Sequence, residues 1–159
     1  MYVAIFGLIM FIATGLVYSI EEGYFSSGVA PQESPLALLL VNTTPLKIEI
    51  ARTPYERRKG LSHREELPQD TGLWFVFDTP DTHGIWMKDM KFPIDIVWVD
   101  STFAVVHIEE NVTPESYPTI FEPPTKATYV LEVNRGVVSA LGMKVGDTLR
   151  YMEFVAENE

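Results

Sequence analysis

After residue 35, alternating apolar and polar positions predict β-strands along most of the chain. Leu36 to Val41 is a short apolar run that ends in a turn, and Lys47 to Ala51 alternates like a half-buried strand. Leu73 to Phe77 is apolar throughout, which is typical of a buried strand. Further strands are expected over residues 85–90, 94–99, 103–108, 127–133 and 148–155, and a long loop over 111–124.

Two short helices interrupt these strands. Thr53, Pro54 and Glu56 fit the N-cap, first and third positions of a capping box, and the helix is expected to end at Gly60. A second helix is expected over residues 136–141, with Asn134 as its cap. No regular alternation of strand and helix is present. The pattern therefore predicts a mostly β (α+β) domain, a small antiparallel barrel or sandwich with two short helices at its edge.

The first 20 residues differ from the rest, because Tyr2 to Ile20 contains no charged side chain. A helix of this length just spans a bilayer core of roughly 30 Å. The segment is either a single-pass anchor or a signal peptide cleaved after Ser19. Glu21 and Glu22 follow it at once, which favours a cytoplasmic N-terminus and a domain on the extracytoplasmic side of the cytoplasmic membrane, or a secreted domain after cleavage.

These features predict three parts: a membrane segment over 1–20, a flexible linker over 21–35 and a single β-rich globular domain over 36–159. The formal net charge is −10 from 12 basic and 22 acidic residues. A nucleic-acid backbone needs a basic surface, so the acidity argues against a nucleic-acid partner. There is no cysteine, which excludes disulfides, cysteine nucleophiles and thiolate metal sites.

Charged residues gather in the aromatic-rich stretch from Gly84 to Asp95. A charge inside an otherwise apolar strand must be paired, exposed or functional. We expect a polar pocket here, to which Arg64 and Glu132 contribute from two other segments of the chain. Its candidate ligand-binding residues are Arg64, Trp86, Lys88, Asp89, Asp95 and Glu132. The alternative is that Asp95 is a structural carboxylate that accepts hydrogen bonds from backbone amides.

The three histidines form no H-x-x-x-H or H-E-x-x-H pattern, and no metal site or cofactor is predicted. His107 is expected to be an ordinary strand residue. His83 lies in a loop beside Asp81 and is the better candidate for acid–base chemistry. No nucleophile elbow, P-loop or dinucleotide fingerprint is present.

Four runs carry a family resemblance: ERRKGLSHREELPQDTGLWFVF, HGIWMKDMKFPIDIVWVD, YVLEVNRG and LGMKVGD. They resemble the family named domain of unknown function 192, from about Ile48 to Tyr151. The resemblance implies a compact β-rich fold and no established activity or cofactor. By this resemblance the marked positions are Gly60, Leu61, Arg64, Gly72, Trp86, Met87, Lys88, Pro93, Asp95, Leu131, Glu132 and Gly136. Ser62 and Asp89 depart from the family pattern, which often has Met and Asn there.

Two classes of function follow. The first is a membrane-tethered binding module of the cell envelope for a small ligand or a protein, since no catalytic constellation is visible. The second is a hydrolase or another enzyme that uses Asp95 or His83 as its acid–base group.

Overall fold

A computed structural model of the chain describes residues 36–154. Seven strands form one sheet in the order β6-β5-β8-β3-β2-β1-β9, and β4 and β7 form a separate two-stranded sheet. The strands are β1 (Leu36–Val41), β2 (Thr44–Ala51), β3 (Thr71–Asp81), β4 (Ile85–Trp86), β5 (Ile94–Val99), β6 (Val105–Val112), β7 (Ile120–Phe121), β8 (Ala127–Asn134) and β9 (Arg150–Phe154). The helices are α1 (Pro54–Lys59), α2 (Val137–Leu141) and a 3-10 turn, η1 (Pro114–Ser116).

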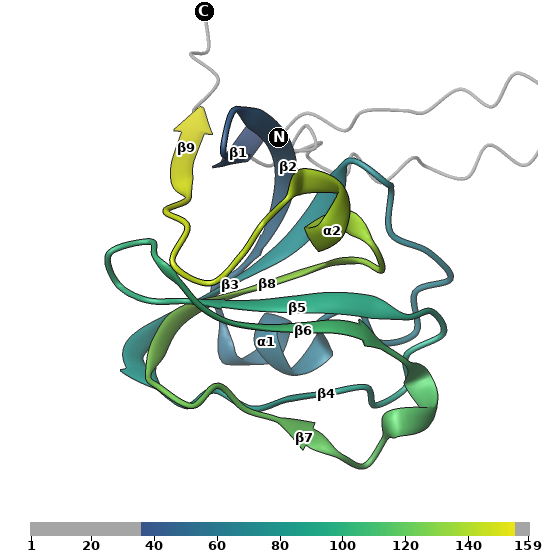
Figure 1. The fold of residues 1–159 in the computed structure, drawn as a ribbon. Helices are drawn as coiled ribbons and strands as arrows, with labels where there is room; N and C mark the ends of the chain where they lie inside the picture. The colour runs from purple at the N-terminus through teal and green to yellow at the C-terminus, as the bar shows by residue number, and fades with distance from the viewer. Residues whose placement is uncertain (1–35, 155–159) are drawn as a thin grey trace, which may run out of the picture. The chain divides into compact units, whose positions relative to one another are not determined.

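The predicted mostly β fold is confirmed, in its sandwich-like form. The large sheet does not close into a barrel, because its edge strands β6 and β9 do not pair with each other. They approach at a single bridge between Ala104 and Thr148, just before each strand begins. Figure 1 shows α1 and α2 on opposite sides of the central strands, with β4 and β7 on the side of α1.

One strand pair departs from the expected antiparallel arrangement. β2 and β3 are parallel, with Ile50 opposite Trp74, and α1 lies in the connection between them. Parallel neighbours need such a crossover. The sequence pattern did not predict this strand–helix–strand unit, because a six-residue helix is much shorter than the usual crossover helix.

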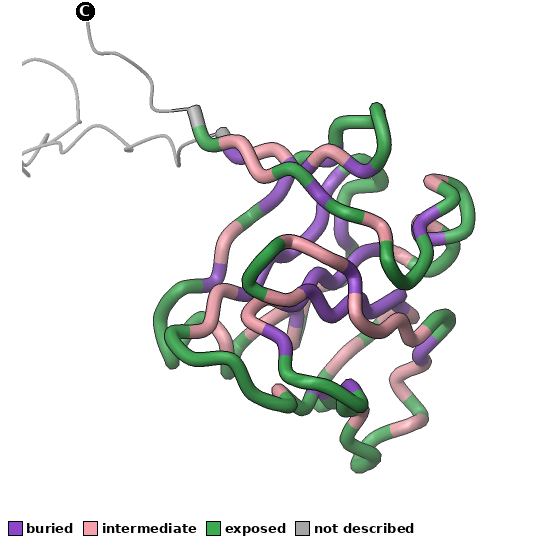
Figure 2. The backbone as a smooth tube through the Cα atoms, turned by 60° about the vertical axis from the view of Figure 1, so that its left-hand side comes forward, coloured by how far each residue is buried: buried purple, intermediate pink, exposed green. Residues whose placement is uncertain are grey.

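Hydrophobic residues of the central strands pack on both faces of the large sheet. In β5, Val97 and Val99 belong to the cluster with α2, while Ile96 and Trp98 belong to the cluster on the other face. This division is the one that their alternation predicted. Figure 2 shows buried residues in the interior of the domain and exposed residues in the loops around it. The alternation along a strand therefore indicates which face of the sheet each side chain occupies.

Two segments differ from their predicted structure. The strand expected over residues 85–90 ends at Trp86, because the chain turns where the amide of Met90 donates to the carbonyl of Met87. Asp89 occupies this turn with a φ of 56°. The region 111–124, expected to be a loop, contains η1 and the strand β7.

The cap of α2 also differs from its prediction. Gly136, not Asn134, is the N-cap residue, and it adopts a left-handed conformation with a φ of 87°. The Asn134 side chain instead donates to the carbonyl of Leu67 at 2.7 Å. Neither α-helix in the range 36–154 has the length and apolar character that spanning a bilayer requires. The predicted anchor and linker lie outside the described residues.

Candidate functional site

Helix α1 forms one wall of the candidate site, and its N-terminus has the predicted capping box. The amide of Glu56 donates to the Thr53 hydroxyl, and the Glu56 carboxylate accepts from the amide of Thr53. Pro54 occupies the first turn, where its missing N–H costs nothing. These local bonds start the helix and fix the direction in which its last turn points.

Arg57 fastens this helix to strand β3. Its guanidinium donates to the carbonyls of Arg52 and Val76, the second at 2.7 Å, and lies 5.1 Å from the centre of the Phe77 ring. Two further bonds tie the turn after α1 to the turn after β4. The Ser62 hydroxyl donates to the Lys88 carbonyl at 2.9 Å, and the His63 amide donates to the Asp89 carbonyl at 2.9 Å. The two walls of the site are thus joined by hydrogen bonds.

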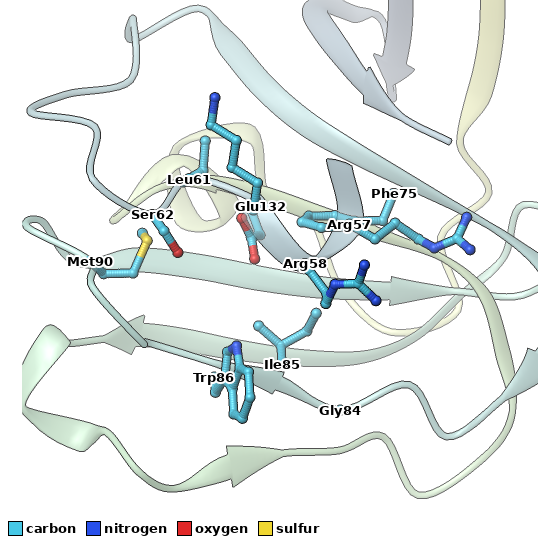
Figure 3. A pocket seen from close by; sticks show the side chains of 12 residues that line it. Arg57, Arg58, Leu61, Ser62, Phe75, Gly84, Ile85, Trp86, Met90 and Glu132 are labelled. Carbon is cyan, nitrogen blue, oxygen red and sulfur yellow. The ribbon is translucent and has the colours of Figure 1, made fainter. Parts of the chain in front are cut away.

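Two adjoining hollows lie between α1 and β4. The inner pocket has a volume of about 60 Å³ and is lined by Phe75, Ile85 and Glu132 beneath the turn Gly60–Ser62 (Figure 3). The outer groove has a volume of about 510 Å³ and continues toward Tyr55 and Lys88. Both hollows share the lining residues Arg58, Lys59, Ser62 and Trp86. Together they form a polar site with one buried end and one open end.

Glu132 lies at the buried end because of its place in the sheet. Strand β8 lies between β3 and β5, and Glu132 is opposite Leu73 on one side and Ile96 on the other. Both neighbours are buried and apolar, and Glu132 itself is only 5% exposed. Its Oε2 atom has no hydrogen-bond partner within the described residues. A buried carboxyl without a partner is costly, so this atom calls for a functional explanation.

Burial also determines the charge of this group. It raises the pKa of Glu132 to about 8, although the positive charge of Arg64 acts in the opposite direction. Glu132 is therefore mostly protonated at neutral pH. A neutral carboxyl can both donate and accept a hydrogen bond, which an ionised carboxylate cannot.

Arg64 does not hydrogen-bond to Asp95 or to Glu132. Its guanidinium makes a two-pronged ion pair with Glu49 on β2, at 2.8 and 2.7 Å. This ion pair raises the pKa of Arg64 and leaves the Glu132 carboxyl outside it. Arg64 lines neither hollow and acts on Glu132 through its charge.

The structure does not bring Asp95 to the predicted pocket. Asp95 is fully buried, and its carboxylate accepts from the backbone amides of Asn111, Gly136 and Val138 at 2.9, 2.8 and 3.2 Å. Two of these amides start α2, so Asp95 caps that helix from a neighbouring strand. The predicted single cluster is wrong at this residue, and the structural alternative describes it correctly.

The other predicted site residues lie on the open groove. Trp86 and Lys88 are exposed, while Met87 between them is buried. The Lys88 ammonium lies 5.9 Å from the centre of the Trp86 ring. Asp89 lines the same groove, 3.8 Å from the ring nitrogen of His63.

His83 lines neither hollow. Its ring stacks on Phe77 at 3.5 Å, and one ring nitrogen lies 3.0 Å from the Thr79 carbonyl. Burial lowers the pKa of this imidazole, so it is neutral at physiological pH. His107 lies on β6 beside Glu109, as an ordinary strand residue. Among residues 36–154, no three histidine or acidic side chains lie close enough together to hold a metal ion.

The sequence pattern did not predict Arg58, Lys59 and Ser62 as lining residues. The two cations follow Arg57 in the last turn of α1, where attraction to the helix C-terminus explains them without a ligand. The parallel pairing of β2 with β3 places this turn over the sheet next to β8. The sequence pattern did not predict that pairing, and without it these lining residues could not be predicted.

A family model for DUF192, described as Uncharacterized ACR, matches residues 38–151. The chain belongs to the DUF192 family. Six of the positions marked by the family resemblance fall into two groups in the structure. Gly60, Leu61, Trp86 and Glu132 line the inner pocket, whereas Asp95 bonds to the amide of Gly136 on the other face of the sheet.

Two solved structures share the fold of this DUF192 chain. One is a proposed transcription regulator from Sinorhizobium meliloti 1021, with 31% identity, a TM-score of 0.68, and coverage of 74% of this chain and 92% of that one. The other is a protein of unknown function from Novosphingobium aromaticivorans DSM 12444. It has 31% identity, a TM-score of 0.65, and coverage of 73% of this chain and 83% of that one. No curated protein matches the chain.

Proposed function

We propose that this domain is a binding module that holds a small molecule between α1 and β4, with Glu132 at the buried end. The observation that carries the proposal is the Oε2 atom of Glu132, which is buried beside the inner pocket without a partner. A ligand atom in that pocket would supply the missing hydrogen bond. The joined outer groove provides the volume that small-molecule sites usually have.

The enzyme alternative receives less support from the geometry. Asp95 already accepts three backbone hydrogen bonds, and His83 is stacked on Phe77, so neither residue faces the two hollows. An acid–base group must reach the proton that it transfers. We therefore favour binding over catalysis by these two residues.

We further propose that the domain works outside the cytoplasmic membrane, tethered by the apolar segment Tyr2–Ile20. The proposal rests on the sequence of that segment and on the two acidic residues that follow it. Regulation of transcription is named only for the Sinorhizobium meliloti protein. The net charge of −10 argues against a nucleic-acid partner for this chain.

The binding site can be tested by fragment screening with a pocket-filling variant. We expect small molecules to shift the NMR signals of the Trp86 indole N–H and of the Gly60–Ser62 amides. Ser62→Phe fills the junction of the two hollows and should abolish these shifts. The matched control is Ser139→Phe, because Ser139 is exposed on α2 and should leave binding unchanged. A screen without any shift at the groove, or binding that survives Ser62→Phe, contradicts the proposal.

A further inference from the structure

The outer groove carries positive charge on an acidic protein. Arg58, Lys59 and Lys88 line it, and none of them forms an ion pair with a carboxylate within residues 36–154. Other basic residues are paired, for example Lys47 with Asp70 and Arg64 with Glu49. Basic residues that are also unpaired but line neither hollow are Lys126, Arg135, Lys144 and Arg150. Three cations without an ion-pair partner among the described residues therefore line the outer groove.

The one carboxylate on the outer groove does not cancel this charge. Asp89 lies 3.8 Å from His63, and its position follows from the turn that it forms, where the φ of 56° suits Asp or Asn. Three cations against one carboxylate leave an excess of positive charge. Anionic groups are the ligands that such an excess attracts.

An exposed aromatic surface borders the same cations. Trp86 is 48% exposed and Tyr55 is 68% exposed, and both line the outer groove. Tyr117 holds the Trp86 indole from one side, with their ring centres 6.3 Å apart in an edge-on arrangement. Trp86 also pairs with Ile120 across β4 and β7, which fixes its backbone. A positioned, half-exposed indole is a surface on which a ring can stack.

The buried end of the site is compatible with an anion. An ionised carboxylate at Glu132 would repel a negative ligand, but burial keeps this group protonated at neutral pH. The protonated carboxyl can donate a hydrogen bond to a ligand oxygen. The inner pocket, at about 60 Å³, has room for a small polar substituent, and the groove, at about 510 Å³, has room for a ring.

We propose that the ligand is a small ring compound with a carboxylate or phosphate group. Arg58, Lys59 and Lys88 bind the anionic group, the ring stacks on Trp86, and a polar substituent bonds to the Glu132 carboxyl. This inference rests on the proposed function, since it names the ligand class for the same site. The shared chemistry is a ring joined to an anion, and both sugar acids and aromatic acids have it.

The test titrates the folded domain with matched probes and follows the Trp86 indole N–H by NMR. D-galacturonate is compared with D-galactose, and benzoate with benzamide, so each charged ring has a neutral partner. Acetate supplies the charge without a ring. We expect at least one charged ring to bind about tenfold more tightly than its neutral partner and than acetate. The sugar and aromatic arms show which kind of ring the site accepts.

Charge-removing variants locate the effect. Arg58→Ala combined with Lys88→Ala should weaken binding of the charged ring by about tenfold. The matched control removes two lysines outside the site, Lys126→Ala with Lys144→Ala, and should leave binding unchanged. Equal binding of neutral and charged rings, or equal losses in the two double variants, overturns the inference while the binding site stands. Absence of any shift at the groove with every probe and fragment overturns the proposed function as well.

Discussion

Asp95 and Glu132 lie on adjacent strands of one sheet, and their side chains point to opposite faces of it. Asp95 pairs with Val133 and Glu132 with Ile96, so the two carboxyls are one residue apart in register. Asp95 receives three backbone N–H bonds, whereas Oε2 of Glu132 has no partner within the described residues. The first carboxyl supports the fold, and the second is left for a ligand.

Asp95→Asn should destabilise the domain by about 2 to 4 kcal/mol, because the amide replaces a buried carboxylate that accepts charge-assisted bonds from three backbone N–H groups. Urea denaturation measures this loss. Asp78→Asn is the control, since its exposed carboxylate lies 3.6 Å from Arg57 and should change stability little. Wild-type stability of Asp95→Asn would contradict the structural role.

Glu132 makes the stability of the domain depend on pH. Its pKa is about 8 in the folded protein against an ordinary value of 4.5, so the folded state binds the proton more tightly. The stabilising contribution is complete below about pH 4.5 and is lost as the pH rises through about 8. The free energy of unfolding should therefore fall between these values, by at most about 1.4 kcal/mol per pH unit.

The matched variant for this prediction is Glu132→Gln, which keeps the shape of the side chain and cannot ionise. Urea denaturation from pH 5 to pH 9 should show wild type losing stability relative to Glu132→Gln. Other groups titrate in both proteins, so the difference between the two profiles isolates Glu132. Parallel profiles would show that the carboxyl has an ordinary pKa.

Much of the fold could be predicted because it depends on local patterns. The alternation in β5 predicted its two faces, and Thr53 with Glu56 predicted the start of α1. The parallel pairing of β2 with β3 could not be predicted in this way. Strand pairing depends on contacts between distant segments, and the six-residue α1 gave no sign of a crossover.

The candidate site was predicted in part for the same reason. Charges among apolar strand residues mark unusual positions in the sequence. The residues singled out in this stretch of the chain and on β8 that line the two hollows are Trp86, Lys88, Asp89 and Glu132. Asp95 carries the same mark but serves α2 instead, and only the tertiary structure distinguishes the two cases. From the sequence alone, a buried carboxylate that accepts hydrogen bonds from distant backbone amides cannot be distinguished from a functional carboxylate.

Thr53→Ala should cost about 1 kcal/mol of stability, because the Thr53 hydroxyl accepts the Glu56 amide at 3.2 Å in the capping box. Chemical denaturation measures the change. Thr82→Ala is a suitable control, because Thr82 is exposed and its hydroxyl does not cap a helix. Equal midpoints for Thr53→Ala and wild type would mean that the cap does not stabilise α1.

The charge-free segment Tyr2–Ile20 predicts a domain outside the cytoplasmic membrane. Protease added to intact spheroplasts that express the full chain should remove the domain. Release of the domain into the medium would identify a cleaved signal peptide, and retention on the membrane would identify an anchor. Protection of the domain until the cells are lysed would contradict an extracytoplasmic domain.

Glu49→Gln should lower the pKa of Glu132, although the two residues do not bond. Glu49 neutralises Arg64 through a two-pronged ion pair, and the positive charge of Arg64 favours the ionised form of Glu132. Removing the Glu49 charge strengthens the field of Arg64 at the buried carboxyl, so we expect the pKa of Glu132 to decrease. A carbon-13 NMR titration of the Glu132 carboxyl measures it. Glu153→Gln breaks the separate ion pair with Arg52 and should leave the titration unchanged. An unaltered pKa in Glu49→Gln would show that Arg64 is electrostatically isolated from the site.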